Sequence, residues 1–275
     1  MAIAAAAGLL TCPHCGQELV LDGTGARCAA GHSWDLARQG YLNLLAGPQP
    51  RNADSVEMLA ARSRVLDSGL FDPLLELVAG HTRQARRILE VGAGTAHYLR
   101  HCLGDDPAAT GVALDVSVPA ARLAARADER IAAVVADAWR ELPIRDHAVE
   151  AVLSIFAPRN LGEFARVLTA DGRLLVLAPN PGHLAVLRER FGLLAIEPGK
   201  QERLLAAASE FFEVTATSRL RTPVALSAGQ AADVIAMGPN AFHHPPLPTE
   251  PVSDHLDVTL RVFRPLPGTV DLSSD

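Results

Sequence analysis

The chain has 275 residues, of which 49% are hydrophobic and 20% are charged; this balance is typical of a globular protein and excludes a largely disordered one. The length suits one large domain, or one domain of roughly 200 residues with a small companion. The net charge of −6 excludes a protein that is basic throughout, so a polyanion has to be bound by a local face or by shape and base contacts. No stretch approaches the ~18 consecutive apolar residues of a membrane helix, and we expect no membrane partner.

The first ten residues are apolar and rich in alanine, but they lack the basic region that opens a signal peptide. We therefore expect a frayed terminus and, with no targeting signal, a cytoplasmic protein. Residues 1–47 contain turn signals and no long helical period, and the run Gly47-Pro-Gln-Pro50 follows them as a linker. The pattern predicts that residues 1–47 form a module of their own.

Four side chains that can bind a metal lie in this first module. Cys12-Pro-His-Cys15 and Cys28-Ala-Ala-Gly-His32 each form a tight turn that can direct two ligands at one ion. Together they predict a closed tetrahedral zinc site, and zinc binding can supply the folding energy that so short a segment lacks. Free buried thiols or a disulfide are the alternatives. His14 is a weaker competitor for the place of His32.

Residues 48–84 are predicted to form a helical linker region. Asp54-Ser-Val-Glu57 has the pattern of a capping box, in which Asp54 caps a helix that runs to about Leu66. Phe71-Asp-Pro73 begins a second helix, which runs to about Val78.

From residue 85 to residue 275, short apolar strands alternate with helices. The expected strands are 87–91, 109–114, 131–136, 149–155 and 173–177, with late strands at 212–220 and 256–263, and the expected helices are 95–103, 119–127, 161–168, 182–191 and 200–210. This alternation predicts right-handed βαβ units and an α/β fold, with a parallel sheet covered by helices on both faces.

A glycine-rich turn joins the first strand and the first helix of this region. In Ile88-Leu-Glu-Val-Gly92-Ala-Gly94-Thr-Ala96 the two glycines let the backbone approach a ligand, and the following helix offers free N–H groups. The dinucleotide-binding pattern needs glycine at position 97, where this chain has histidine. The pattern common in methyltransferases fits better, with Ala96 in place of its third glycine.

Three acids stand at or near the ends of successive strands. Glu90 precedes the turn, where methyltransferases use an acid to support the methionine end of S-adenosylmethionine (SAM). Asp115 ends the next strand, where a carboxylate can hold both ribose hydroxyls, and Asp137 ends the third, where an acid can bind the adenine amino group. Because these strand ends meet at one edge of the sheet, the pattern predicts a SAM-binding crevice. The alternative is that the acids are strand-end caps and turn formers.

The fourth strand ends in Ser154-Ile-Phe-Ala-Pro-Arg-Asn160, at the edge that faces the transferred methyl group in this architecture. Phe156 can stack on a flat base, unless it is a core residue, and Asn160 either contributes to the site or caps the next helix. His183, after the fifth strand, can contact cofactor or substrate. Cys102 lies on an amphipathic helix and is expected to pack in the core.

Together these residues resemble the guanine-N1 methyltransferases of 23S ribosomal RNA, in particular the actinobacterial members that confer resistance to tylosin-type macrolides. The resemblance spans nearly the whole chain. Its most specific parts are Cys12-Pro-His-Cys15 with Cys28 and His32, Trp34-Asp-Leu-Ala-Arg-Gln-Gly-Tyr-Leu-Asn-Leu-Leu45, Leu66-Asp-Ser-Gly69, Phe156-Ala-Pro-Arg-Asn160 and Ala236-Met-Gly-Pro239.

The resemblance implies three regions: a zinc-binding RNA-recognition domain at 1–47, a helical linker region at 48–84, and a methyltransferase domain at 85–275. The last is expected to be a Rossmann-like class I SAM-dependent methyltransferase with a mostly parallel seven-stranded sheet. The implied substrate is an exposed guanine in the helix 35 hairpin loop of 23S rRNA. The implied assembly is a homodimer with a shared RNA-binding cleft.

The resemblance also assigns site residues by matching motif. The zinc ligands are Cys12, Cys15, Cys28 and His32, and the cofactor contacts are Phe71, Glu90, Gly92, Ala93, Gly94, Thr95, Ala96, Asp115, Asp137 and His183. Phe71 stands where relatives often have tyrosine, so one hydrogen bond to the cofactor is in doubt. A tryptophan common after the Met-Gly-Pro run is replaced here by Phe242-His-His.

The expected reaction is an in-line displacement in which guanine N1 attacks the methyl carbon. N1 carries a proton in neutral guanine, and the sequence offers no obvious base, so we expect alignment to supply most of the catalysis. Stacking of the flipped base on Phe156, and a hydrogen bond to its edge from Asn160 or a backbone carbonyl, are the hypotheses for the catalytic residues.

Two other functions fit parts of the sequence. The acidic net charge favours a small-molecule methyltransferase, but that function leaves the zinc module without a purpose. A non-catalytic zinc RNA-binding protein is the other alternative, and the intact set of Glu90, Gly92, Gly94, Asp115 and Asp137 argues against it.

Overall fold

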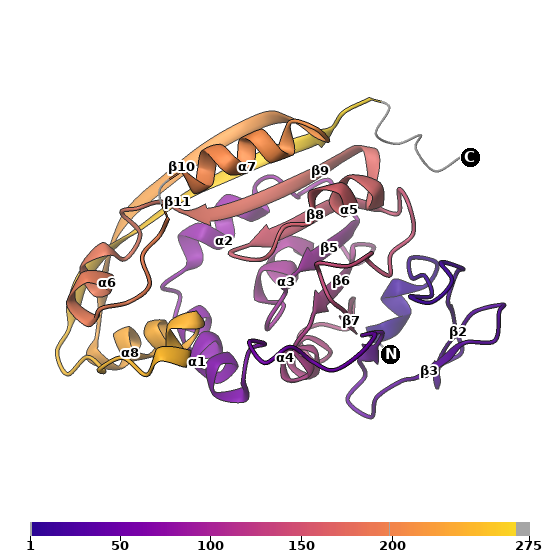
Figure 1. Ribbon diagram of the computed structural model, residues 1–275, viewed down its shortest axis with the longest axis horizontal. Helices are drawn as coiled ribbons and strands as arrows, with labels where there is room; N and C mark the ends of the chain where they lie inside the picture. The colour runs from indigo at the N-terminus through magenta and orange to yellow at the C-terminus, as the bar shows by residue number, and fades with distance from the viewer. Residues whose placement is uncertain (1, 198, 268–275) are drawn as a thin grey trace.

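An eight-stranded sheet forms the centre of the computed structural model, which describes residues 2–197 and 199–267 (Figure 1). The strand order is β10-β11-β9-β8-β5-β6-β7-β4, and neighbouring strands run parallel from β9 to β4. The strands are β4 (Leu42–Asn43), β5 (Arg87–Val91), β6 (Thr110–Asp115), β7 (Ile131–Val135), β8 (Val149–Ile155), β9 (Leu168–Pro179), β10 (Phe212–Leu226) and β11 (Val252–Pro265). The mostly parallel sheet is confirmed, with β4 added to the seven expected strands.

Helices cover both faces of this sheet. One face packs against α1 (Val56–Asp67), α2 (Asp72–Ala79), α3 (His97–Leu103), α4 (Val118–Ala124), α6 (Ala185–Phe191) and α8 (Ala228–Ala236). The other face packs against the 3-10 helix η1 (Ala2–Ala6), α5 (Leu161–Val167) and α7 (Lys200–Ala208). A second 3-10 helix, η2 (Pro239–His243), follows α8. Because the central strands are buried on both sides, their carboxyl ends are where polar side chains can gather.

The N-terminal residues pack against the sheet, so the expectation of a frayed terminus is wrong. Helix η1 buries Ile3 and Ala6, and Leu10 is fully buried and bridges to Ile144. Strand β4 then pairs with β7 at the edge of the main sheet. Residues 1–47 therefore share a core with the sheet, and the domain boundaries at 47 and 84 stay predictions.

A small antiparallel sheet lies between these two contacts. It consists of β1 (Val20–Leu21), β2 (Gly25–Arg27) and β3 (Ser33–Asp35) and projects beside β7 in Figure 1. Its strands have two or three residues and bury few apolar side chains. Such strands are too short to hold together by their own packing.

The start of the first α-helix, one further helix and the late strands differ from the expectation. Ser55, not Asp54, caps α1, because its hydroxyl accepts a hydrogen bond from the Met58 N–H, while the Asp54 carboxylate pairs with Arg62 instead. Helix α8 was not predicted, although Ser227 and Gln230 form a complete capping box at its start. The late strands β10 and β11 are also longer than expected, because they pair with each other along almost their whole length.

Among the described residues, no helix combines the length and the apolarity that crossing a membrane requires.

Candidate metal centre and active site

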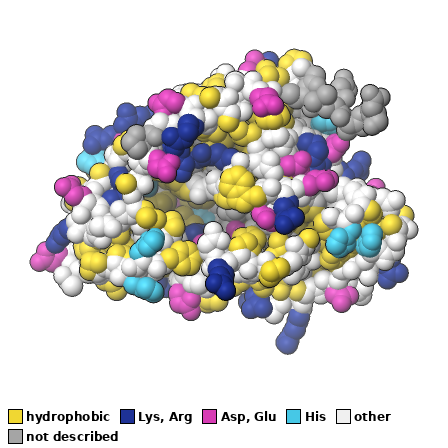
Figure 2. All heavy atoms as spheres, in the orientation of Figure 1, with side chains coloured by type: hydrophobic (Ala, Val, Ile, Leu, Met, Phe, Trp, Pro, Cys, Tyr) yellow, Lys and Arg dark blue, Asp and Glu magenta, His cyan; other side chains and the backbone are white. Residues whose placement is uncertain are grey.

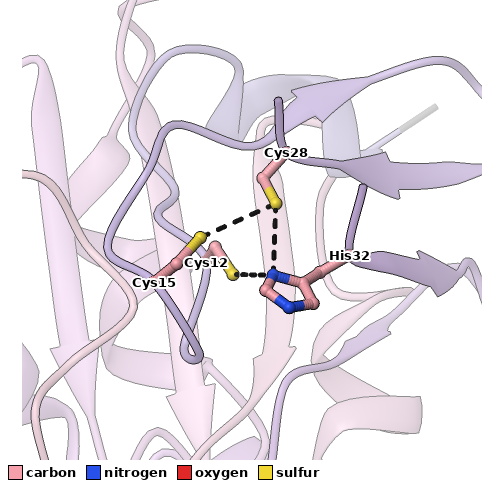
Figure 3. Close-up of side chains that lie close together, drawn as sticks. All are labelled: Cys12, Cys15, Cys28 and His32. Carbon is pink, nitrogen blue, oxygen red and sulfur yellow. Dashed lines mark hydrogen bonds between the residues drawn. The ribbon is translucent and has the colours of Figure 1, made fainter. Parts of the chain in front are cut away.

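The four predicted metal ligands converge on one point in the N-terminal module (Figure 3). The Cys15 and Cys28 sulfurs lie 3.7 Å apart, and the His32 Nδ1 lies 3.4 Å from the Cys12 sulfur and 3.5 Å from the Cys28 sulfur. Tetrahedral zinc with ordinary bond lengths separates two sulfurs by about 3.8 Å and a sulfur from a nitrogen by about 3.6 Å. The donor set and its spacing therefore fit a structural zinc ion, and all four ligands come from the protein.

His14 is not part of this cluster, as expected. Its ring lies beside the site and stacks on Trp34, with ring centroids 5.7 Å apart and an interplanar angle of 22°. The two ligand turns have glycines in the left-handed region, Gly16 at φ +69° and Gly31 at φ +88°. A side chain is strained in that conformation, so these turns favour glycine.

The glycine-rich turn after β5 packs closely against the loop after β8, against Arg62 and against β6. Gly92 (φ +70°) lies under the loop that follows β8, since a Cβ there would come within 2.7 Å of the Ala157 Cβ. Gly94 (φ +54°) lies against Arg62, whose Nη1 would be 2.6 Å from such a Cβ. The N–H groups of Gly92 and Ala93 both donate to the Leu114 carbonyl, which binds the turn to β6. Only glycine leaves room for these close approaches.

Asp115 is the central acid of this turn. Its carboxylate accepts hydrogen bonds from the Gly94 N–H at 2.8 Å and from the Ser117 N–H at 2.8 Å. Burial raises the pKa of Asp115, and these two hydrogen bonds oppose that rise. Asp137, two residues after β7, is half-buried and accepts a hydrogen bond from the Trp139 N–H. Both acids thus lie at the carboxyl edge of the sheet, where they were predicted.

Glu90 lies inside β5, beneath the turn, and is 2% exposed. Burial raises its pKa to about 8, although the Leu99 N–H donates to its carboxylate, and the charge of Asp115 raises the pKa further. Arg62 acts in the opposite direction. Glu90 is therefore mostly protonated at neutral pH, and a cation brought close to it would favour its ionised form.

Arg62 is a site residue that the sequence analysis missed. It comes from α1, donates to the Asp54 carboxylate at 2.5 Å and to the Met237 carbonyl at 2.7 Å, and lies against Gly94. Its partner Met237 is 175 residues away in the chain. The helical pattern of residues 56–67 gives no sign that one arginine turns toward the glycine-rich turn.

Phe156 ends the fourth strand with an exposed ring and is not a core residue. It is 42% exposed and has a φ of +54°, in the left-handed region that phenylalanine rarely adopts. Its ring centroid lies 5.9 Å from that of His183. Asn160 stands at the start of α5 without capping it, because its side chain donates to the Arg140 carbonyl instead.

His183 is half-buried, and its ring is neutral at neutral pH. Burial lowers its pKa to about 4, and Arg188 acts in the same direction. Its Nδ1 accepts the Asp257 backbone N–H at 3.2 Å, so the proton of the neutral ring is on Nε2. His183 is therefore a hydrogen-bond donor at neutral pH and a poor base.

For the remaining predicted cofactor contacts, the structure gives position and burial. Thr95 is half-buried and Ala96 (φ +57°) is buried just before α3. Phe71 is 3% exposed and lies in the hydrophobic core at the start of α2. Cys102 is buried as expected, and burial raises its pKa to about 12.

Two protein families and several curated proteins are similar to this chain. The zinc-ribbon family described as RlmA, N-terminal, matches residues 10–49, and the family described as Methyltransferase domain matches residues 89–176. The Streptomyces fradiae protein named 23S rRNA (guanine(748)-N(1))-methyltransferase is 42% identical, over 94% of this chain and 97% of its own. Proteins named for 23S rRNA guanine-N1 methylation are 39% identical in Micromonospora griseorubida, over 94% and 97%, and 34% identical in Bacillus subtilis, over 66% and 68%.

The geometry of the metal centre predicts different results for two neighbouring substitutions. Wild type and His14→Ala should each hold about one zinc ion per chain, whereas Cys28→Ala should lose most of it, because three ligands remain. Atomic absorption of protein purified without chelators measures this. In Cys28→Ala, limited proteolysis should cleave residues 12–35 first, because their short strands depend on the ion. Zinc loss in His14→Ala, or full zinc in Cys28→Ala, would contradict the ligand set.

Proposed function

The chain belongs to the family of 23S rRNA guanine-N1 methyltransferases, and on this basis we propose that it transfers a methyl group from SAM to N1 of a guanine in 23S rRNA. The observation that carries the proposal is the match over 94% of the chain to a protein named for this reaction. The structure has features that suit both the zinc ion and the cofactor. The Cys3His cluster fits zinc, and the glycine-rich turn is hydrogen-bonded to Asp115.

The target within the RNA is the finer part of the proposal. The S. fradiae protein is named for guanine 748, and we assign this chain to the same hairpin loop of helix 35. The cytoplasm, where ribosomes are found, is the expected location. Resistance to tylosin-type macrolides and a homodimeric assembly follow from the family resemblance alone and stay predictions.

The carboxyl edge of the sheet offers groups that suit each part of SAM. Asp115 is assigned to the ribose hydroxyls and Asp137 to the adenine amino group. Arg62 suits the carboxylate of the methionine end, and the ammonium is the cation that would favour the ionised form of Glu90. Gly92, Ala93, Gly94, Thr95 and Ala96 supply backbone close to the cofactor, with Phe71 and His183 as the remaining contacts. When bound, SAM supplies a methyl group activated by the neighbouring sulfonium charge.

Phe156 is assigned to the substrate guanine. An exposed ring at the carboxyl edge can stack on a base that has left the RNA loop. The neutral His183 beside it can donate a hydrogen bond but cannot readily take the N1 proton. We therefore assign that proton to water or to a nearby oxygen, and the protein's contribution to alignment of N1 with the methyl carbon.

Primer extension across helix 35 tests the reaction directly. Purified protein with SAM should produce a stop one nucleotide before the modified guanine, because a methyl group on N1 blocks Watson–Crick pairing. The reaction without SAM is the control, and both naked 23S rRNA and ribosomal particles serve as substrates. Bound SAM with no stop on either RNA would favour the small-molecule methyltransferase instead.

Phe156→Ala tests the stacking role. Loss of the ring should lower kcat/KM for the RNA by about 10- to 100-fold, in line with the energy of stacking one base on an aromatic side chain. SAM affinity should stay at the wild-type value. The matched control is Val214→Ala, which removes a 46% exposed apolar side chain near the start of β10, at the opposite edge of the sheet. Equal turnover in Phe156→Ala and wild type would exclude this role.

Glu90→Gln separates cofactor binding from stability. The folded-state pKa of about 8 lies above the ordinary value of 4.5, so wild type loses stability as the pH rises from about 4.5 to about 8. Glutamine does not ionise, so the free energy of unfolding of the variant should exceed that of wild type by a difference that grows across this range. SAM affinity, measured by calorimetry, should instead fall about 10-fold, because the charge that pairs with the ammonium is gone.

The control for this substitution is Glu210→Gln, at an exposed position between α7 and β10. It should change neither property. A Glu90→Gln variant that binds SAM as tightly as wild type would remove Glu90 from the cofactor site.

A further inference from the structure

Arg159 is a half-buried residue with one buried atom that lacks a hydrogen-bond partner among the described residues. It lies in the loop after β8, three residues beyond Phe156, and the buried atom is its Nε. Burial lowers the pKa of Arg159, and the positive charge of Arg261 lowers it further. An arginine stays charged at neutral pH all the same. Its position therefore destabilises the protein unless an anion comes close.

Arg261 is the neighbouring charge. It lies on β11 and donates to the side chain of Gln201 on α7. Burial lowers its pKa as well, and the carboxylate of Glu202 only partly opposes this effect. Two partly desolvated guanidinium groups thus lie within electrostatic reach of each other, and neither forms an ion pair with an acid among the described residues.

The strand register explains why the segments that carry these two residues lie near each other. Ser154 on β8 is paired with Val176 on β9, and Val176 is paired with Arg261 on β11, so the three side chains share one face of the sheet. The Ser154 hydroxyl donates to the Pro158 carbonyl, which folds the loop back over this row. Arg159 is the next residue in this loop, and Arg261 is close enough for its charge to lower the pKa of Arg159.

The same face continues as a basic surface toward the end of β10. Arg219 and Arg221 lie on it, two and four residues beyond the pair Thr217–Arg261 and closer to the carboxyl edge. Asp257 is the acid among them, and it is already paired with Arg219 at 2.8 Å. In the view of Figure 2, basic side chains gather between the position of α7 and the hollow near the centre of the molecule. Arginine is therefore in excess beside the proposed guanine position.

We propose that Arg159 and Arg261 form a phosphate-binding site for the RNA strand that carries the target guanine. The inference rests on the proposed function, because it takes the anion from the substrate of that reaction. Two guanidinium groups match the oxygens of a phosphate in charge and geometry. The ribose alone separates a base stacked on Phe156 from its backbone phosphates, and Arg159 follows Phe156 by three residues, so one phosphate can enter this site. The site holds the strand while the loop base leaves its stack.

Binding of the helix 35 hairpin to full-length protein tests this, with S-adenosylhomocysteine present so that no transfer occurs. Arg159→Gln and Arg261→Gln should each weaken binding about 10-fold and reduce the slope of log K against log salt by about one. The matched control is Arg83→Gln, which removes an exposed arginine just before β5, at the opposite edge of the sheet, and should leave binding near the wild-type value.

Replacing single phosphates by uncharged groups identifies the phosphate that binds Arg159 and Arg261. When each phosphate of the loop is replaced in turn by an uncharged methylphosphonate, one replacement should weaken wild type but not Arg159→Gln. SAM affinity should be unchanged in both variants. Weaker SAM binding would mean that the anion bound by the two arginines is the carboxylate of the cofactor. An equal loss of RNA affinity at every phosphate would mean that the arginines attract the RNA only by diffuse electrostatics. Either result overturns the site.

The unfolding temperature of an Arg159 variant shows whether Arg159 has a purely structural role. Arg159→Met removes a partly buried charge and keeps an unbranched apolar side chain in its place, so its unfolding temperature should equal or exceed that of wild type. A large drop would mean that Arg159 serves the fold. If wild type methylates the hairpin but Arg159→Gln binds it equally well, the phosphate site alone fails. If wild type neither binds nor methylates it, the proposed function fails, and the site with it.

Discussion

The carboxylate of Asp115 holds together the parts of the molecule that meet at the active site. It accepts the Gly94 and Ser117 N–H groups, and so fixes the glycine-rich turn and the start of α4 at the end of β6. The Ser117 hydroxyl then donates to the Asp54 carbonyl, and the Asp54 carboxylate pairs with Arg62. Arg62 in turn donates to the end of α8 through the Met237 carbonyl. One acid thus connects the sheet with α1, α4 and the end of α8.

The methyltransferase region and the N-terminal module are stabilised by different interactions. The methyltransferase region depends on a sheet whose central strands are buried on both faces, where packing fixes the backbone of each strand. The three short strands of the N-terminal module have no such core, and a metal ion can supply what they lack. Because η1 and β4 pack on the main sheet, the module is tethered on both sides even where the ion does not reach.

The sequence predicts what is encoded locally. The two metal-binding turns, the glycine-rich turn and Asp115 at a strand end are contiguous patterns, and the structure places each of them as expected. Arg62 and Arg159 could not be found this way, because their roles depend on Met237, 175 residues distant, and on the register of β8, β9 and β11. The helix start at Ser55 failed for a related reason, since the long-range pair with Arg62 occupies the Asp54 carboxylate.

The acidic net charge and a polyanionic substrate are compatible once the pairing of charges is considered. Counterions screen exposed charges over about 8 Å at physiological salt, so distant acids contribute little at the site. Several acids are also matched by arginines, as in the pairs Arg64–Asp233 and Arg166–Glu163. At the carboxyl edge, the RNA approaches a local excess of guanidinium groups around Arg159 and Arg261. A buried charge without a partner lowers stability in the free protein, and an approaching phosphate relieves that penalty, so binding strength is concentrated beside the reacting base.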